Sequence, residues 1–254
     1  MNKFAIIVAT NNDEILEKNL LSSKVIRDKN CPLILQRGYR NIGRAYNEAM
    51  GKTSAQILVC LHQDVFLPDG WETRLLTALD KLEKSKWGVL GVAGIKLAEG
   101  RKVLVGHIRD RGTEFGSSEG LPARVDTLDE LLLVIRNDRN LLFDEQIPTT
   151  HMYGADICLQ ASSQGLGSFA IDAYCHHNAS DVNRDTPEFR MAVKYMQKKW
   201  KRRLPFVTTC TLVESKTVEN IRRVVKGLRL QPLAQPFAAG LKRVRNLRQL
   251  RKES

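Results

Sequence analysis

The triplet His62-Gln63-Asp64 directly follows the apolar run 56–61. Polar groups at the end of a buried segment cost solvation energy unless they are used. The Asp64 carboxylate suits Mg²⁺ or Mn²⁺, which prefer one or two carboxylates together with phosphate oxygens. The alternative is that Asp64 caps the turn before Pro68-Asp69-Gly70. A second ligand nearby would favour the metal interpretation.

The pair His176-His177 offers that second ligand, because it follows another apolar run, 169–174. Either imidazole is able to bind Mn²⁺. The pair would otherwise cap the preceding strand, or contact phosphate as imidazolium. The sequence does not choose between the two histidines.

Asp156 lies near the start of an apolar stretch with helical spacing. One interpretation is structural, since a carboxylate in the first turn of a helix caps it or interacts favourably with its dipole. The other is chemical, because a carboxylate held in this position is able to act as a general base.

Short apolar runs alternate with amphipathic segments and provide the elements that must position these residues. Runs without alternation predict buried strands, and spacing of three or four predicts helices. The expected strands are 4–9, 24–28, 56–61, 89–95, 131–135 and 169–174, and the expected helices begin near residues 13, 41, 71, 153 and 187.

This alternation predicts an α/β fold with a mixed, mostly parallel sheet and helices on both faces. In such sheets ligands bind beyond the carboxyl ends of the strands. The three polar groups above follow or adjoin strand ends, so we expect them to lie near one another. Residues 96–150 are rich in glycine and charge and show little pattern apart from the strand at 131–135.

The net charge of +12 is distributed unevenly along the 254 residues. Residues 1–193 hold 23 basic and 25 acidic residues, whereas residues 221–254 hold ten basic residues and one acidic residue. A uniform excess would favour a polyanion binder. The segregation instead predicts a folded domain over 1–205 and a basic, partly amphipathic, helical extension over 206–254.

The basic extension has two interpretations. A solvated or disordered tail is the simpler one. The other is attachment of residues 221–254 to an anionic membrane surface, where each Lys or Arg contributes on the order of 1 kcal/mol. Phe237 is the one aromatic residue of this segment. We therefore expect no nucleic-acid partner, since binding to single strands relies on aromatic stacking.

The five cysteines form no C-x-x-C pair, and no apolar run approaches the roughly 18 residues of a membrane span. The apolar run 4–9 is also too short for a signal peptide. We therefore expect a cytoplasmic protein, peripheral at the inner face of the cell membrane.

Several short strings, in this order, resemble the family 2 glycosyltransferases, and in particular the branch with the domain first named from streptomycin biosynthesis. The resemblance covers roughly residues 1–200. It rests on Val8-Ala9-Thr10-Asn11-Asn12, Arg40-Asn41-Ile42-Gly43 with Asn47, Leu61-His62-Gln63-Asp64-Val65-Phe66-Leu67-Pro68 with Trp71, Gly91-Val92-Ala93-Gly94, Val125-Asp126-Thr127-Leu128-Asp129-Glu130, Phe143-Asp144-Glu145, and His151-Met152-Tyr153-Gly154-Ala155-Asp156-Ile157-Cys158-Leu159.

The resemblance implies a GT-A fold that binds a nucleotide-diphosphate sugar across its strand ends, with Mn²⁺ or Mg²⁺ on the diphosphate. Asp64 matches the last acid of the metal-binding D-x-D motif, and His62 replaces the first acid. His176 or His177 resembles the late metal-binding histidine. Asp156 matches the catalytic base, with Ala155 where Glu stands in the family motif. The implied donor contacts are Thr10, Asn11, Asn12, Arg40, Asn41, Asn47, His62 and Gln63.

The implied reaction is an inverting transfer to a hydroxyl of a glycan or lipid-linked acceptor, in surface polysaccharide or glycolipid synthesis. Asp156 would take the proton of the attacking hydroxyl. Two alternatives come from other classes of protein. A sugar nucleotidyltransferase would carry a glycine-rich basic loop after the first strand, which residues 10–16 lack. A non-catalytic protein that binds membranes or polyanions would rely on the extension alone.

Overall fold

The structure is a computed structural model that describes residues 3–29, 31–138, 140–179 and 186–218. One compact unit extends to Val213, and a second begins at Glu214. The helical, membrane-binding segment predicted over 221–254 lies outside the described residues. The folded unit includes residues 206–213, which follow the boundary expected from the charge pattern.

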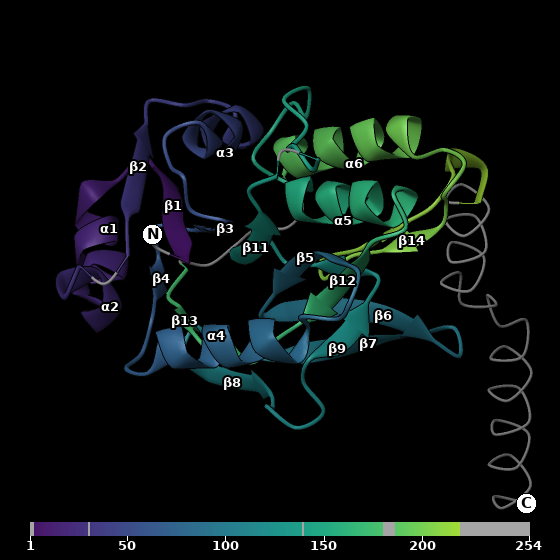
Figure 1. The fold of residues 1–254 in the computed structure, drawn as a ribbon. Coiled ribbons are helices and arrows are strands. Elements are labelled where there is room, and N and C mark those ends of the chain that lie inside the picture. Colours follow the sequence, from purple (N-terminus) through teal and green to yellow (C-terminus); the bar gives the residue numbers. More distant parts are fainter. Residues whose placement is uncertain (1–2, 30, 139, 180–185, 219–254) are drawn as a thin grey trace, which may run out of the picture. The chain divides into compact units, whose positions relative to one another are not determined.

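A seven-stranded mixed sheet forms the centre of the first unit (Figure 1). β1 pairs in parallel with β2 and β3, and β12 pairs in parallel with β5. β11 runs antiparallel to both of its neighbours, and β9 is antiparallel to β12. The predicted α/β class is confirmed, but the sheet is less parallel than expected. Its order is β2 (Leu33–Arg37), β1 (Phe4–Thr10), β3 (Ile57–Leu61), β11 (Leu132–Arg136), β5 (Trp87–Gly91), β12 (Gly167–Ala170) and β9 (Ala123–Val125).

A second sheet comes mainly from the stretch where the sequence pattern is weak. The expected strand 89–95 is two strands, because the chain leaves the first sheet after Gly91 and enters the second at Ala93. The second sheet has the order β10 (Thr127–Leu128), β6 (Ala93–Ala98), β7 (Arg101–Asp110), β13 (His176–His177) and β4 (Val65–Phe66), with β8 (Thr113–Gly116) on β7.

Helices cover both faces of the central sheet, and the alternation along β1 shows why. Phe4, Ile6 and Val8 join the cluster beneath α4 (Trp71–Lys81). Ala5 and Ile7 point to the other face, beneath α3 (Ile42–Met50) and α5 (Tyr153–Ser163). Successive side chains of a strand face opposite sides, so a wholly apolar strand implies a sheet covered twice.

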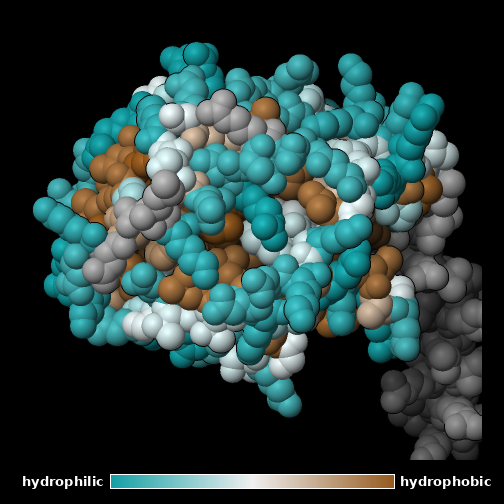
Figure 2. Space-filling model, viewed as in Figure 1, coloured by the Kyte–Doolittle hydropathy of each residue, from teal (hydrophilic) through white to brown (hydrophobic). Residues whose placement is uncertain are grey.

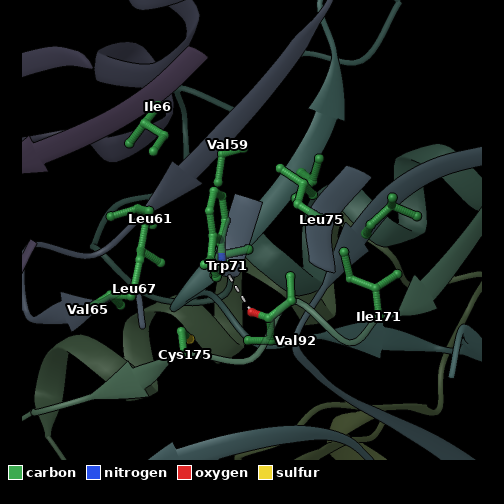
Figure 3. Close-up of a cluster of buried hydrophobic side chains, with 14 of the residues drawn as sticks. Ile6, Val59, Leu61, Val65, Leu67, Trp71, Leu75, Val92, Ile171 and Cys175 are labelled. Carbon is green, nitrogen blue, oxygen red and sulfur yellow. Dashed lines mark hydrogen bonds between the residues drawn. The ribbon is translucent and has the colours of Figure 1, made fainter. Parts of the chain in front are cut away.

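Trp71 fills the centre of the α4-side cluster, among Val59, Leu75 and Val92 (Figure 3). Its indole nitrogen donates a hydrogen bond of 3.1 Å to the carbonyl of Ala173. The indole thus joins α4 to the segment that leads into β13.

The segment between β1 and β2 is helical. It contains α1 (Asp13–Lys18), the 3-10 turn η1 (Leu20–Ser22) and α2 (Lys24–Arg27). The strand predicted over 24–28 was therefore wrong, and β2 lies further along the chain. A run as short as Val25-Ile26 fits either element, and only Val25 is buried.

The described part of the chain ends in a layer outside α5. α6 (Pro187–Lys199) begins at the N-cap Thr186 and packs Ala192 and Met196 against α5. The small hairpin of β14 (Phe206–Val207) and β15 (Leu212–Val213) joins the same cluster. None of the helices in the described ranges is long and apolar enough to cross a membrane.

Candidate functional site

Gln63 joins the ends of β1 and β3. Its Oε1 accepts hydrogen bonds from the Thr10 hydroxyl at 2.6 Å and from the backbone N–H groups of Asn11 and Asn12 at 3.1 Å. Its Nε2 donates to Asn11 Oδ1 at 2.9 Å. Asn12 also caps α1 by accepting from the Ile15 N–H. Four of the predicted donor contacts thus meet at one edge of the sheet.

His62, Asp64 and His177 form a compact cluster beside this edge, with their candidate ligand atoms within 4.8 Å of one another. Asp64 Oδ1 lies 3.9 Å from His62 Nδ1 and 3.5 Å from His177 Nε2. This oxygen is buried and has no hydrogen-bond partner among the residues that the structure describes. A buried oxygen left in this way is costly unless something binds it. One carboxylate and two imidazoles form a donor set for a divalent transition metal.

The short strand β13 determines which of the two adjacent histidines joins the cluster. β13 pairs in parallel with β7 and antiparallel with β4. His177 faces Asp64, whereas the ring of His176 lies 5.5 Å from that of Phe66 and 5.4 Å from that of Tyr174. Neighbouring residues of a strand point to opposite faces. His176, predicted as a possible metal ligand, is therefore turned away from the cluster.

Two further side chains hold the cluster histidines in place. His177 Nδ1 lies 2.8 Å from Asp110 Oδ1, and His62 Nε2 lies 2.8 Å from the Tyr153 hydroxyl. Both contacts leave the opposite ring nitrogen facing Asp64. Outer contacts of this kind orient metal-binding imidazoles.

The charges of His62, Asp64 and His177 depend on one another. Burial lowers the pKa of His62, and attraction to Asp64 only partly opposes this. Burial also acts to lower the pKa of His177, but the nearby carboxylates of Asp64 and Asp110 outweigh it, so that pKa is raised. The pKa of Asp64 is lowered, since the two histidines outweigh its burial. Asp64 is therefore an anion at neutral pH.

A cavity of about 200 Å³ opens beside the cluster. Its polar walls include His62, His177, Asp129 and Glu130, and its apolar walls come from both sheets and from α5 and α6. Asp129 accepts hydrogen bonds from the Leu131 N–H at 3.2 Å and the Thr209 hydroxyl at 2.8 Å. The remaining lining residues are Ile108, Asp110, Arg111, Leu128, Leu131, His151, Met152, Ala155, Ala179, Phe189, Thr208 and Cys210.

Glu130 stands at the start of α5, where its Oε1 accepts from the Gly154 N–H at 3.3 Å. Burial raises the pKa of Glu130 to about 8, and repulsion from Asp129 adds to the increase. Glu130 is thus mostly protonated at neutral pH.

Asp156, predicted as the catalytic base, does not line this cavity. Its side chain is 1% exposed and forms an ion pair of 2.7 Å with Lys199. The Trp200 indole and the Gln160 amide each donate to it at 2.7 Å. The carboxylate therefore joins α5 to the end of α6, an arrangement that argues against the predicted role.

The other predicted donor contacts lie around α3. Asn41 caps this helix by accepting from the Arg44 N–H, and its amide donates to the carbonyls of Glu145 and Ile147. Asn47 exchanges hydrogen bonds with the backbone of Phe143. Both amides are thus occupied in holding residues 143–147. Arg40 is exposed beside them.

Asp110, Tyr153 and Asp129 are site residues that the sequence analysis did not assign. Asp110 ends β7, a strand that the sequence did not reveal. Tyr153 and Asp129 were within strings already noted, but nothing in their spacing showed that they face His62 and the cavity. Asp110 is recognised as a polar residue at a strand end only when β7 is known.

Comparisons with known proteins identify the family of this chain. A family model described as "Glycosyltransferase like family" matches residues 5–200. A protein from Fuscovulum blasticum, named "ATP synthase subunits region ORF 6", is 30% identical over 158 residues, which are 59% of this chain and 64% of that protein. The chain thus spans less than two thirds of this curated relative.

Two solved structures are similar at low identity. TarS of S. aureus in complex with UDP-GlcNAc is 14% identical, with a TM-score of 0.47 over 78% of this chain and 66% of that one. The mannosyltransferase PcManGT of Pyrobaculum calidifontis in complex with GDP-Man and Mn²⁺ is also 14% identical, with a TM-score of 0.45 over 77% of this chain and 61% of that one. Because the family model matches residues 5–200, which include the ends of β1 and β3, the cluster of His62, Asp64 and His177, and α5, the chain belongs to the glycosyltransferase like family.

Proposed function

We propose that this protein is a metal-dependent, inverting glycosyltransferase that moves a sugar from a nucleotide-diphosphate sugar to a hydroxyl of a glycan or lipid-linked acceptor. We further propose the streptomycin-biosynthesis-type branch of the family and a role in surface polysaccharide or glycolipid synthesis. Family membership supports transfer of a sugar, and the motif strings support the branch.

The observation that carries the proposal is the buried, unpartnered Oδ1 of Asp64 between two histidine nitrogens. Asp64 and His177 would hold a divalent cation, with His62 as the third ligand. A bound Mn²⁺ or Mg²⁺ would neutralise the charge that develops on a diphosphate leaving group. TarS and PcManGT were solved with a nucleotide sugar, and PcManGT also with Mn²⁺, which makes UDP- and GDP-sugars suitable first probes.

Inversion requires a base on the acceptor side. The family resemblance and the cavity point to different carboxylates for this role. The family resemblance implies Asp156, which is bound by Lys199 and Trp200 and does not line the cavity. Asp129 lines the cavity together with His62 and His177. We therefore propose that Asp129 accepts the proton of the attacking hydroxyl, and that Asp156 anchors α6.

Donor binding is tested by thermal unfolding with UDP, GDP, UDP-GlcNAc and GDP-mannose, each with and without Mn²⁺. A ligand at 100 times its dissociation constant stabilises the folded state by about 2.7 kcal/mol. We expect stabilisation by a nucleotide that depends on Mn²⁺. A chain that none of a full panel of nucleotides stabilises, with or without metal, is not the proposed enzyme.

The assignment of the base is tested with the nucleotide sugar that stabilises the protein most. We expect Asp129→Asn to lower the rate of donor cleavage by about 10²-fold or more, the usual contribution of a general base, while donor affinity stays within a few fold. Retention of the donor's configuration in the product would exclude inversion. Loss of cleavage in a folded, donor-binding Asp156→Asn protein, with Asp129→Asn active, would return the role to Asp156.

We also propose that the protein is cytoplasmic and peripheral at the inner face of the cell membrane, held there by residues 221–254. The ten basic residues of this segment support the proposal. A membrane location would bring the cavity near lipid-linked acceptors.

A further inference from the structure

The hairpin of β6 and β7 carries two large apolar side chains that are about half exposed. Leu97 is 48% exposed and Leu104 is 50% exposed. The turn between the strands has Glu99 and Gly100 in the left-handed region, with φ of 52° and 74°. Such a tight turn lets the hairpin extend from the second sheet (Figure 1).

The register places both leucines on one face of the hairpin. Leu97 pairs with Lys102, and Leu104 pairs with the buried Ile95. Directly opposite residues of an antiparallel pair point to the same side. We call Leu97, Lys102 and Leu104 the leucine face. Val103, which is 37% exposed, lies on the opposite face.

A groove of about 270 Å³ adjoins the leucine face. Leu97 and Phe206 are among its apolar walls, and Arg124 and Arg203 are its basic residues. Arg203 lies 3.4 and 3.2 Å from the hydroxyls of Ser162 and Ser163, and Arg124 is exposed. The groove also contains Asp126, whose Oδ2 accepts from the Leu97 N–H at 2.7 Å.

Apolar side chains and basic groups are thus combined on one surface. Hydrophobic residues reach the surface elsewhere too, in several separate patches among hydrophilic ones (Figure 2). At the leucine face and its groove, however, the basic residues Lys102, Arg124 and Arg203 outnumber the acids, which are Asp126 and, in the hairpin turn, Glu99. This is the combination that binds the interface of an anionic bilayer, where leucines enter the acyl boundary and cations contact headgroups.

We propose that the leucine face and the adjoining groove dock on an anionic phospholipid surface. The contact lies wholly within the first compact unit, so it is distinct from attachment through residues 221–254. It also does not depend on the nature of the sugar donor.

The test places a tryptophan on each face of the hairpin in the full chain. Leu104→Trp is mixed with phosphatidylcholine vesicles containing phosphatidylserine and brominated lipid, which quenches indoles at acyl depth. We expect a blue shift and quenching beyond the wild-type signal, and little change for the matched control Val103→Trp. Equal quenching of both variants, or none for Leu104→Trp when the protein is bound, would overturn the proposal, because the tail alone would then be responsible.

The charge requirement is tested separately. We expect Arg124→Gln and Arg203→Gln each to weaken binding to these vesicles by about fivefold, the effect of one basic residue near such a surface. The matched control, Lys81→Gln on α4, should bind as the wild type does. Equal quenching of Leu104→Trp by pure phosphatidylcholine vesicles would contradict the anionic requirement. Self-association that Leu104→Ser abolishes without lipid would instead show that a second copy covers this face.

Discussion

Two adjacent histidines have different surroundings at the candidate metal site, and this difference gives a direct test. We expect His177→Gln to abolish the Mn²⁺-dependent thermal stabilisation, because His177 Nε2 faces Asp64. His176→Gln is the matched control, since its ring contacts Phe66 and Tyr174 instead. The measurement is the unfolding temperature as a function of Mn²⁺ concentration. The reverse result would mean that β13 binds metal through its other face.

Glu130 gives a pH dependence of known sign. Its pKa is about 8 in the folded protein, above the ordinary value of 4.5, so folding binds a proton. The stability it contributes is complete below about pH 4.5 and is lost as the pH rises through 8. The free energy of unfolding of Glu130→Gln should therefore rise, relative to that of the wild type, by about 1 to 3 kcal/mol from pH 5 to pH 9. This range is lowered because the Glu130 side chain is partly exposed. Urea unfolding of both proteins at pH 5 and pH 9 measures this difference. The same pH dependence of stability in the variant and the wild type would contradict the prediction.

Among the site residues, Asp64 was predictable because it follows a buried strand, whereas Gln63 and Thr10 were predicted through the resemblance to the glycosyltransferases. The sequence did not distinguish His176 from His177, since that depends on how β13 pairs with β7 and β4. It also did not show that Asp156 faces α6, because one turn of a buried helix presents polar residues to several neighbours. The direction of a side chain is set by its packing partners, which a single sequence does not reveal.

Among the elements, the packing of α6 on α5 includes one buried carboxylate, that of Asp156. Asp156→Asn removes the charge that Lys199 and the Trp200 indole face. We expect a loss of about 1 to 3 kcal/mol in the free energy of unfolding, because the Trp200 indole and the Gln160 amide lose a charged acceptor, while Lys199 keeps its ion pair with Asp144. The matched control is Lys198→Gln, an exposed position on the same helix, which should stay within about 0.5 kcal/mol. The measurement is unfolding by denaturant. Equal stability of the Asp156→Asn and Lys198→Gln variants would show that Asp156 does not anchor α6.

Strands and helices of the central sheet were largely predictable, because β1, β3 and β11 are apolar runs and α3, α4 and α6 have helical spacing. The second sheet was not, because its strands are short or partly exposed and pair across distant parts of the chain. β7 is exposed along its first four residues and shows no buried run. The strand expected at 24–28 failed since two apolar residues do not define a period.

For the whole molecule, we expect two separable contributions to membrane binding, one from the basic residues 221–254 and one from the leucine face. Truncation after Glu219 removes all ten basic residues of the segment 221–254. We expect flotation with anionic liposomes to fall and to lose most of its dependence on salt, since screening acts on those charges. Thermal unfolding should stay close to that of the full chain, because the compact unit ends at Val213. Unchanged, salt-sensitive flotation would exclude the segment as an anchor.

The two-residue strand β13 has a consequence for the order of folding. Asp64 and His177 are more than one hundred residues apart in sequence, and they meet only when β13 has paired with both β4 and β7. Closing so long a loop is slow compared with forming local helices. We therefore expect the cluster of His62, Asp64 and His177 to be completed late in folding, so that a partly folded chain lacks the assembled site.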